Sequence, residues 1–118
     1  MDIESLREYC IGKKAVTECF PFDEYNLVFK VLDKMFALIN LENPDKICLK
    51  CEPEYAIELR EKYKGIESAF HFNKKHWNQV FLESDVNDNL IKVLIDHSYN
   101  EVIKKFTKKQ KEIYNELP

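Results

Sequence analysis

The sequence is poor in the residues and segments that mark several protein classes. Its 118 residues include only two glycines and four prolines, which argues against long disordered or loop-rich segments. No apolar run approaches the ~18 residues of a membrane helix, so we expect no membrane span. Residues 1–5 are acidic and do not begin a signal peptide, in which a basic region is followed by an apolar run. We therefore expect a cytoplasmic protein.

The chain also lacks a strong excess of either charge. Lys and Arg number 18 against 21 Asp and Glu, a net charge of −3. That balance does not favour bulk attraction to nucleic acid or an anionic membrane. The densest local run is residues 104–111, where five of eight positions are lysine. We interpret it as part of a solvated, Lys-rich helical tail at about 104–118; the alternative is a contact with phosphates or an acidic partner.

Four cysteines are present, and in the cytoplasm they are expected to be reduced thiols. Cys48 and Cys51, with His71 and His76 further on, superficially match a zinc pattern. Residues three apart in a strand point to opposite faces, however, and no glycine-bearing knuckle interrupts this one. We therefore expect no metal, with Cys51 as a core thiol and Cys48 as a partly exposed one.

Motifs of enzyme active sites are missing as well. The sequence has no nucleophile elbow, no paired catalytic carboxylates and no glycine-rich phosphate loop. Both glycines, Gly12 and Gly65, fit the ends of predicted helices. We therefore predict neither catalysis nor a cofactor.

The periodicity of apolar residues predicts one α+β domain spanning residues 1–118. Helices are expected from an Asp2 N-cap to about residue 10, from Pro53 to about 63, and after a cap at Asp85 or Asn87. Strands are expected at 27–31, 34–41, 46–51, about 69–72, and 78–83. Strands joined by short turns and separated by whole helices indicate a mainly antiparallel sheet packed by helices.

Alternation along the strands predicts which side chains share a face of this sheet. Within each of three strands, one set is expected to share a face: Leu27, Phe29 and Val31; Met35, Ala37, Ile39 and Leu41; and Ile47, Leu49 and Cys51. Their opposing sets are Val28 and Lys30; Lys34, Phe36, Leu38 and Asn40; and Lys46, Cys48 and Lys50. On this pattern, Lys30, Lys34 and Lys50 can share one sheet face.

Several blocks resemble the bacterial MmcQ/YjbR family over about residues 2–110. They are residues 20–22, 28–31, 34–37, 49–51, 71–77 and 98–99, and the specific one is His71-x-Asn73-Lys74-x-His76-Trp77. The resemblance implies a compact α+β fold that has been likened to a double-wing DNA-binding module. The chain departs from the family pattern at Asp23, at the Leu32-Asp33 turn and in the tail beyond Lys111.

The function that the residues and the resemblance favour is DNA binding through a basic loop and a sheet face. Lysines contact phosphates, Asn73 and His76 can hydrogen-bond a base edge, and Trp77 can stack on an unpaired base. The candidate site residues are Lys30, Lys50, His71, Asn73, Lys74, Lys75, His76 and Trp77.

The alternative is a non-catalytic module that binds a protein or a small ligand. Aromatic residues near the same loop can line a groove, or they can simply fill a small core. These residues are Phe20, Phe22, Phe70, Phe72 and Trp77. Salt separates the two functions, because binding to several phosphates weakens steeply as salt rises and binding in an apolar groove does not.

Overall fold

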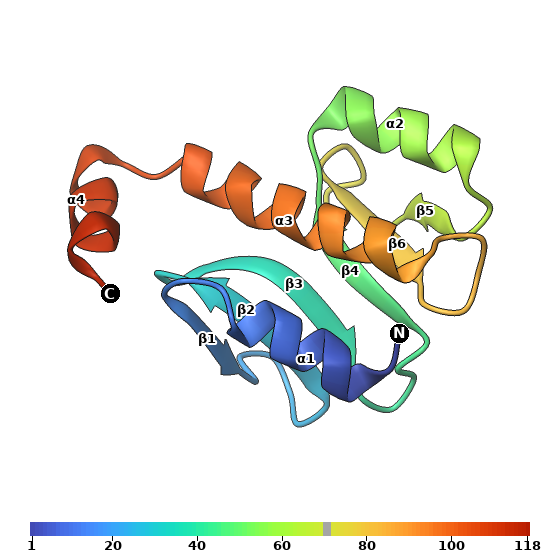
Figure 1. The fold of residues 1–118 in the computed structure, drawn as a ribbon, viewed down its shortest axis with the longest axis horizontal. Helices are drawn as coiled ribbons and strands as arrows, with labels where there is room; N and C mark the ends of the chain where they lie inside the picture. Colours follow the sequence, from blue (N-terminus) through green and yellow to red (C-terminus); the bar gives the residue numbers. More distant parts are fainter. Residues whose placement is uncertain (70–71) are drawn as a thin grey trace.

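The computed structural model describes residues 1–69 and 72–118, which form an α+β fold with one six-stranded sheet (Figure 1). The helices are α1 (Ile3–Ile11), α2 (Pro53–Lys62), α3 (Asp88–Lys104) and α4 (Lys108–Glu116). The strands are β1 (Val16–Cys19), β2 (Asn26–Val31), β3 (Lys34–Asn40), β4 (Lys46–Lys50), β5 (Ile66–Ser68) and β6 (Trp77–Phe81). The strand order is β1-β2-β3-β4-β6-β5, and each pairing is antiparallel. The predicted fold class is confirmed.

Two predicted helix starts are confirmed by their capping bonds. The Asp2 side chain accepts from the backbone N–H of Ser5 at 2.8 Å, and Asn87 accepts from that of Leu90 at 2.8 Å. Both bonds satisfy an N–H group that the first helical turn leaves without a partner. No described helix, within residues 1–69 and 72–118, is both long and apolar enough to cross a membrane.

Gly65 does not end a helix as predicted. α2 ends at Lys62, and the cap residue Tyr63 is already extended. The Gly65 N–H instead donates to Asp85 at 2.8 Å, and a Cβ at this position would collide with the Ser84 side chain. Glycine is therefore required here because the turn before α3 packs directly against the backbone.

Three elements differ from the predicted pattern. The edge strand β1 was not predicted. The strand expected at about 69–72 lies earlier, as β5, and residues 70 and 71 lie outside the described part of the chain. The last helix is followed by a separate one, because Thr107 and Gln110 form a capping box that starts α4. The box gives the chain a new helix start three residues beyond the end of α3.

The sheet has one face covered by helices and one open face. α1, α2 and α3 pack on the covered face, and Figure 1 shows α1 and α3 lying across the same side of the sheet. The main core lies there and contains Leu6, Leu27, Phe29, Phe36, Ile39, Ile47, Leu49, Leu59, Val80, Ile91, Leu94, Ile95 and Val102, among others. A second, smaller cluster lies on the open face and consists of Val28, Leu38, Cys48, Ala69 and Trp77.

A β-bulge in β3 corrects the predicted face of two residues. Phe29 pairs with Ala37 but Lys30 pairs with Met35, so Phe36 is the extra residue. Phe36 therefore joins the main core, and Met35 packs against the open-face cluster. The same shift places Lys34 opposite Val31, a main-core residue. The expectation that Lys34 shares a face with Lys30 is wrong.

The Ser98 hydroxyl on α3 bridges a split between β3 and β4, where the two central strands diverge. β3 and β4 pair only through Ala37–Leu49 and Leu38–Cys48. Beyond these pairs, Ser98 Oγ accepts from the Lys50 N–H at 2.9 Å and donates to the Phe36 carbonyl at 2.6 Å. The buried serine thus satisfies two backbone groups that the diverging strands leave unpaired.

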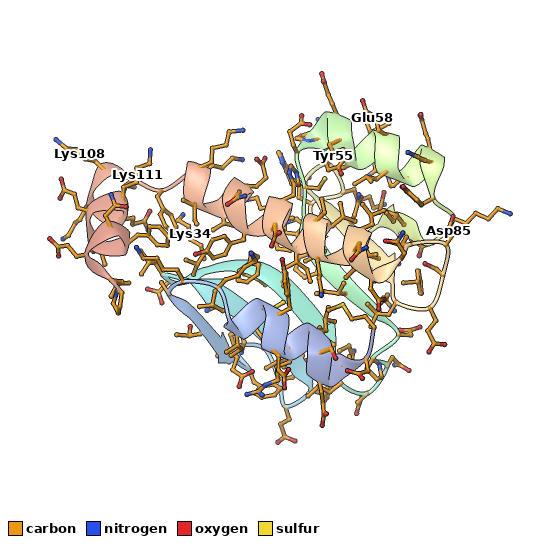
Figure 2. All side chains as sticks on the ribbon, viewed as in Figure 1. Lys34, Tyr55, Glu58, Asp85, Lys108 and Lys111 are labelled. Carbon is orange, nitrogen blue, oxygen red and sulfur yellow. The ribbon has the colours of Figure 1, made fainter. Side chains whose placement is uncertain are left out.

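The Lys-rich tail folds as a helix at the margin of the domain. α4 has no buried residue, and it stands apart from the sheet in Figure 1. Its Tyr114 hydroxyl lies 2.8 Å from that of Tyr99, and its ring packs on Phe106. In Figure 2, Lys108 lies at the outer side of α4, and Lys34 lies between α4 and the sheet.

Candidate functional site on the open sheet face

The strand register places two of the predicted site lysines on the side of the open face. Lys30 pairs with Thr17 and Met35, and Lys50 pairs with Trp77. Directly opposed residues of an antiparallel pair share a face, so Lys30 and Lys50 lie on the side of the second cluster. The prediction that these two lysines share a sheet face is confirmed.

The pKa of Lys50 is lowered, first by burial and then by the neighbouring charges of Lys105 and Lys34. Burial and like charges both disfavour the ammonium form. Positive charge is therefore concentrated where β4 ends beside the C-terminal part of α3. This end of the sheet is named the basic end below.

The turn before β6 is built by Asn73. Its side-chain oxygen accepts from the Lys75 N–H at 3.0 Å, and its carbonyl accepts from His76 and Trp77 at 3.0 and 2.9 Å. The His76 carbonyl accepts from Cys51 at 2.7 Å. Asn73 and the His76 backbone thus fix the turn, while the side chains of Lys74 and Lys75 are exposed at the basic end. His71 lies outside the described residues.

Trp77 is held inside the domain. It is 8% exposed, and the Phe72 ring stacks on it at 4.8 Å between centroids and 24° between planes. A buried indole covered by another ring has no free face for a nucleobase. The expected stacking role of Trp77 is therefore inconsistent with its position in this structure.

The third histidine, His97, is a structural residue. Its Nε2 accepts from the Glu52 backbone N–H at 3.1 Å, and its ring meets Tyr55 edge-on at 5.0 Å. His97 thereby supports the start of α2 from the covered face.

The open face is hollowed into a groove of about 730 Å³. Its apolar lining comes from the second cluster and from three phenylalanines: Leu38, Cys48, Ala69, Phe22, Phe72 and Phe81. Its polar lining is Asn26, Asn40, Asn43, Lys46, Glu67 and Gln79. The volume lies within the range of about 300–1,000 Å³ that is usual for small-molecule sites. We call this hollow the open-face groove.

Hydrogen bonds of Asp23 shape one wall of the groove. Its Oδ1 accepts from the backbone N–H groups of Tyr25 and Asn26 at 3.0 and 2.7 Å, and its Oδ2 accepts from the Asn26 side chain at 2.6 Å. An aspartate that accepts from residues two and three positions on forms a tight local turn. Asp23 thus fixes the loop that presents Phe22.

The groove opens toward the end of the sheet opposite the basic end. β2 begins there, β3 and β4 are joined there, and β6 ends there. Most charged residues in these loops are acidic: Asp23, Glu24, Glu42, Asp45 and Glu83. The open face therefore runs from an acidic end, beside the groove, to the basic end with Lys30, Lys50, Lys74 and Lys75.

The cysteines are placed for packing rather than for nucleophilic chemistry. Cys48 lies in the open-face cluster and Cys51 in the main core, which confirms that they point to opposite faces. Cys48 is buried, not partly exposed as predicted. Burial raises the pKa of Cys10 and Cys51 to about 12 and that of Cys48 to about 11. Thiols with such pKa values carry little thiolate near neutral pH.

Metal-ligating residues do not gather in the described chain. Across residues 1–69 and 72–118, no group of three or more His, Cys, Asp or Glu side chains lies close enough to hold an ion.

Sequence reasoning found part of the groove. Phe22 and Phe72 were expected to line a groove near the His71–Trp77 segment, and both do. Phe20 is exposed and Trp77 is buried beneath Phe72; Phe70 lies outside the described residues. Asn26, Asn40 and Gln79 were missed because only the strand pairing brings them together. The only sequence pattern that pointed to the polar lining was the alternation along the strands, which puts Asn40 and Lys46 on the open face.

Comparison with known proteins gives one consistent family. The YjbR family model matches residues 11–101. "Uncharacterized protein YjbR" of Escherichia coli K12 is 30% identical over 118 residues, covering 99% of this chain and all of that protein. "Uncharacterized protein YbdF" of Escherichia coli O157:H7 is 33% identical over 110 residues, covering 87% of this chain and 88% of the relative.

Solved structures show the same fold. The crystal structure of Deinococcus radiodurans protein DR2400, described as a DUF419 domain, matches with a TM-score of 0.88 and 39% identity over 98% of this chain and 88% of that one. A crystal structure from Pseudomonas syringae matches with a TM-score of 0.72 and 28% identity, over 86% of this chain and 98% of its own.

Proposed function

The chain belongs to the YjbR family, and we propose that it is a non-catalytic binding module whose ligand site is the open-face groove. The observation that carries this proposal is the groove itself. The sheet face opposite α1, α2 and α3 combines an apolar floor with six polar side chains in a hollow of about 730 Å³. Such a mixture of apolar surface and a few convergent polar groups is the usual character of a ligand site.

Phe22 gives the groove a second feature of a binding surface. It is 64% exposed at the mouth, the most exposed of the large apolar side chains described. Covering such a ring removes apolar surface from water and is favourable by roughly 25 cal/mol per Å². A ligand seated in the groove gains this free energy, whereas the unliganded domain does not.

The non-catalytic part of the proposal is supported by what the described reactive groups already do. The three buried thiols have raised pKa values, and His97 is engaged with the backbone of Glu52. A nucleophile needs a lowered pKa or an adjacent base. A cytoplasmic location stays a prediction, supported by four cysteines that are all free.

The test is a nuclear magnetic resonance titration of the isotope-labelled chain with indole, a neutral aromatic probe. We expect saturable shifts of the backbone amides of Leu38, Cys48 and Gln79. Phe22→Ala is expected to weaken binding at least about threefold, because the mouth of the groove loses its exposed ring. Val93→Ala, which truncates an exposed apolar residue on α3, is the matched control and is expected to leave binding unchanged.

Scattered shifts, or equal weakening by Phe22→Ala and Val93→Ala, would contradict a site in the groove. The fold of each variant is checked by circular dichroism, and both truncated side chains are exposed enough for the fold to tolerate their loss.

A second candidate function, DNA binding, is favoured by the basic end. Lys30 and Lys50 share the open face, and the turn with Lys74 and Lys75 lies where β6 begins, at the same end. Lysines in this arrangement supply phosphate contacts without reading sequence. Because Trp77 is covered by Phe72, the proposal for DNA rests on these charges alone.

Fluorescence anisotropy with duplex and single-stranded DNA over a salt series tests this candidate. Lys74→Glu with Lys75→Glu is expected to abolish binding without unfolding the chain, and the wild-type affinity is expected to fall steeply with salt. Lys62→Glu with Lys64→Glu makes the same charge change at two exposed positions, the last residue of α2 and the second residue after it. Equal losses in both double variants would show a response to net charge and remove the basic end from the function.

A further inference from the structure

Two opposite charges line the open-face groove. Lys46 comes from β4 and Glu67 from β5. Lys46 pairs with Phe81, and Glu67 pairs with Gln79, which itself pairs with Cys48. The strand register therefore places both charged side chains on the open face. Their positions are two strands apart across the sheet and two residues apart along the strands.

Strand geometry sets the distance between these two charged positions. With strands about 4.8 Å apart and a rise of about 3.3 Å per residue, the Cα atoms of Lys46 and Glu67 lie about 12 Å apart. A dipeptide spans at most about 7 Å between its ends. The two side chains can thus reach the opposite ends of a ligand of that length.

Both charged groups keep capacity for a ligand. The Lys46 ammonium lies 3.5 Å from Asp45 and 5.5 Å from the centre of the Phe81 ring, and an ammonium has three donors. Glu67 accepts from the Gln79 amide, and a carboxylate offers about four acceptor sites. One bond at each group therefore leaves room for an ionic partner.

The lining excludes two other ligand classes. The lysine that lines the groove already lies beside a carboxylate, and the loops at this end are mostly acidic, so a polyanion such as a nucleotide is repelled. A purely apolar ligand would cover the charged groups of Lys46 and Glu67 without giving them a partner in place of water, which is costly.

We propose that the open-face groove binds a short zwitterionic peptide, two or three residues long, that carries an apolar side chain. Its carboxylate lies near Lys46, its amino group near Glu67, and its apolar side chain on the floor of Leu38 and Cys48. The amide side chains of the wall donate to and accept from its peptide groups. This inference rests on the proposed function, since it names the ligand class of the same groove.

The experiment is isothermal titration calorimetry of the full chain with leucyl-phenylalanine, its N-acetylated form and its C-amidated form. We expect saturable binding of the free dipeptide and an affinity roughly tenfold lower for each blocked form, the usual loss for one charge-assisted hydrogen bond. Lys46→Met is expected to remove the difference between acid and amide. Glu67→Gln is expected to remove the difference between free and acetylated amine.

Two exposed positions outside the groove supply matched controls. Lys62→Met and Glu61→Gln remove the same charges and are expected to preserve both differences. Equal binding of the free and blocked dipeptides would overturn the zwitterionic ligand class. So would indole shifts of the groove amides without binding of any dipeptide. In both cases the groove would remain the proposed ligand site. If neither indole nor any dipeptide binds, the proposed function falls with it.

Discussion

The covered and open faces of the sheet use the same strands for different purposes. Three helices pack on the covered face and complete the main core. The open face buries Val28 and Ala69 completely but leaves a groove above Leu38 and Cys48. Because folding free energy comes mainly from burial, the covered face is expected to hold the fold together. The open face can then vary its polar side chains without loss of the fold.

The largest difference between the two faces is expected when one phenylalanine on each face is truncated. Phe36 is fully buried and meets Tyr99 edge-on at 5.5 Å, so Phe36→Ala is expected to cost about 3–5 kcal/mol of unfolding free energy. Phe72 is only half-buried, and Phe72→Ala is expected to cost about 1 kcal/mol. Urea unfolding measures both, and equal losses would show that the open face is also a core.

A somewhat smaller loss is expected from the serine that closes the split. Ser98→Ala removes the partner of two backbone groups, the Lys50 N–H and the Phe36 carbonyl. Leaving them buried and unpaired costs about 1–3 kcal/mol each, less what water recovers, so we expect a loss of about 3 kcal/mol. The control is Ser84→Ala, which removes an exposed hydroxyl that also bridges two backbone groups, those of Phe81 and Val86. A loss under about 1 kcal/mol is expected there, and similar losses in both variants would contradict the role of Ser98 in the split.

The covered face was largely predictable from the sequence, because it follows from local rules. The caps at Asp2 and Asn87 and the alternation of Ile47, Leu49 and Cys51 come from spacing alone, and the structure confirms them. The short edge strand β1 carried no such signal, since a polar pair, Thr17 and Glu18, occupies half of it.

The open face was predictable only in part, because long-range pairing assembles it. Alternation correctly placed Lys30 and Lys50 on one face but failed for Lys34, where the bulge shifts the register. Residues 35–39 are all apolar, so no polar residue marks where the alternation slips. The groove itself joins side chains from residues 22 to 81, a combination that no local pattern contains.

The contribution of the Cys48 thiol, on the open face, to the unfolding free energy is expected to change by about 1 kcal/mol as pH rises. Burial raises the pKa of Cys48 to about 11, above the ordinary 9.0. The unfolded chain therefore loses this proton first, and the stability that the group contributes below pH 9 is lost as pH rises toward 11. The free-energy difference between wild type and Cys48→Ala is expected to shrink by about 1 kcal/mol between pH 8 and pH 10. A constant difference would show that Cys48 reaches water in the folded state.

The smallest effect is expected at the β2–β3 turn, which lies just before the bulge that assigns β3 residues to the two faces. Leu32 and Asp33 both adopt left-handed backbone, with φ of 47° and 67°, the conformation of a two-residue hairpin turn that glycine adopts most readily. Asp33 is exposed, so Asp33→Gly removes strain without removing packing and is expected to stabilise the chain by about 0.5 kcal/mol. The measurement is urea unfolding together with amide exchange of Met35 and Phe36. Without the bulge, Phe36 would move to the open face. A loss of protection of the Phe36 amide against exchange in Asp33→Gly would therefore show that the strained turn sets the register of β3.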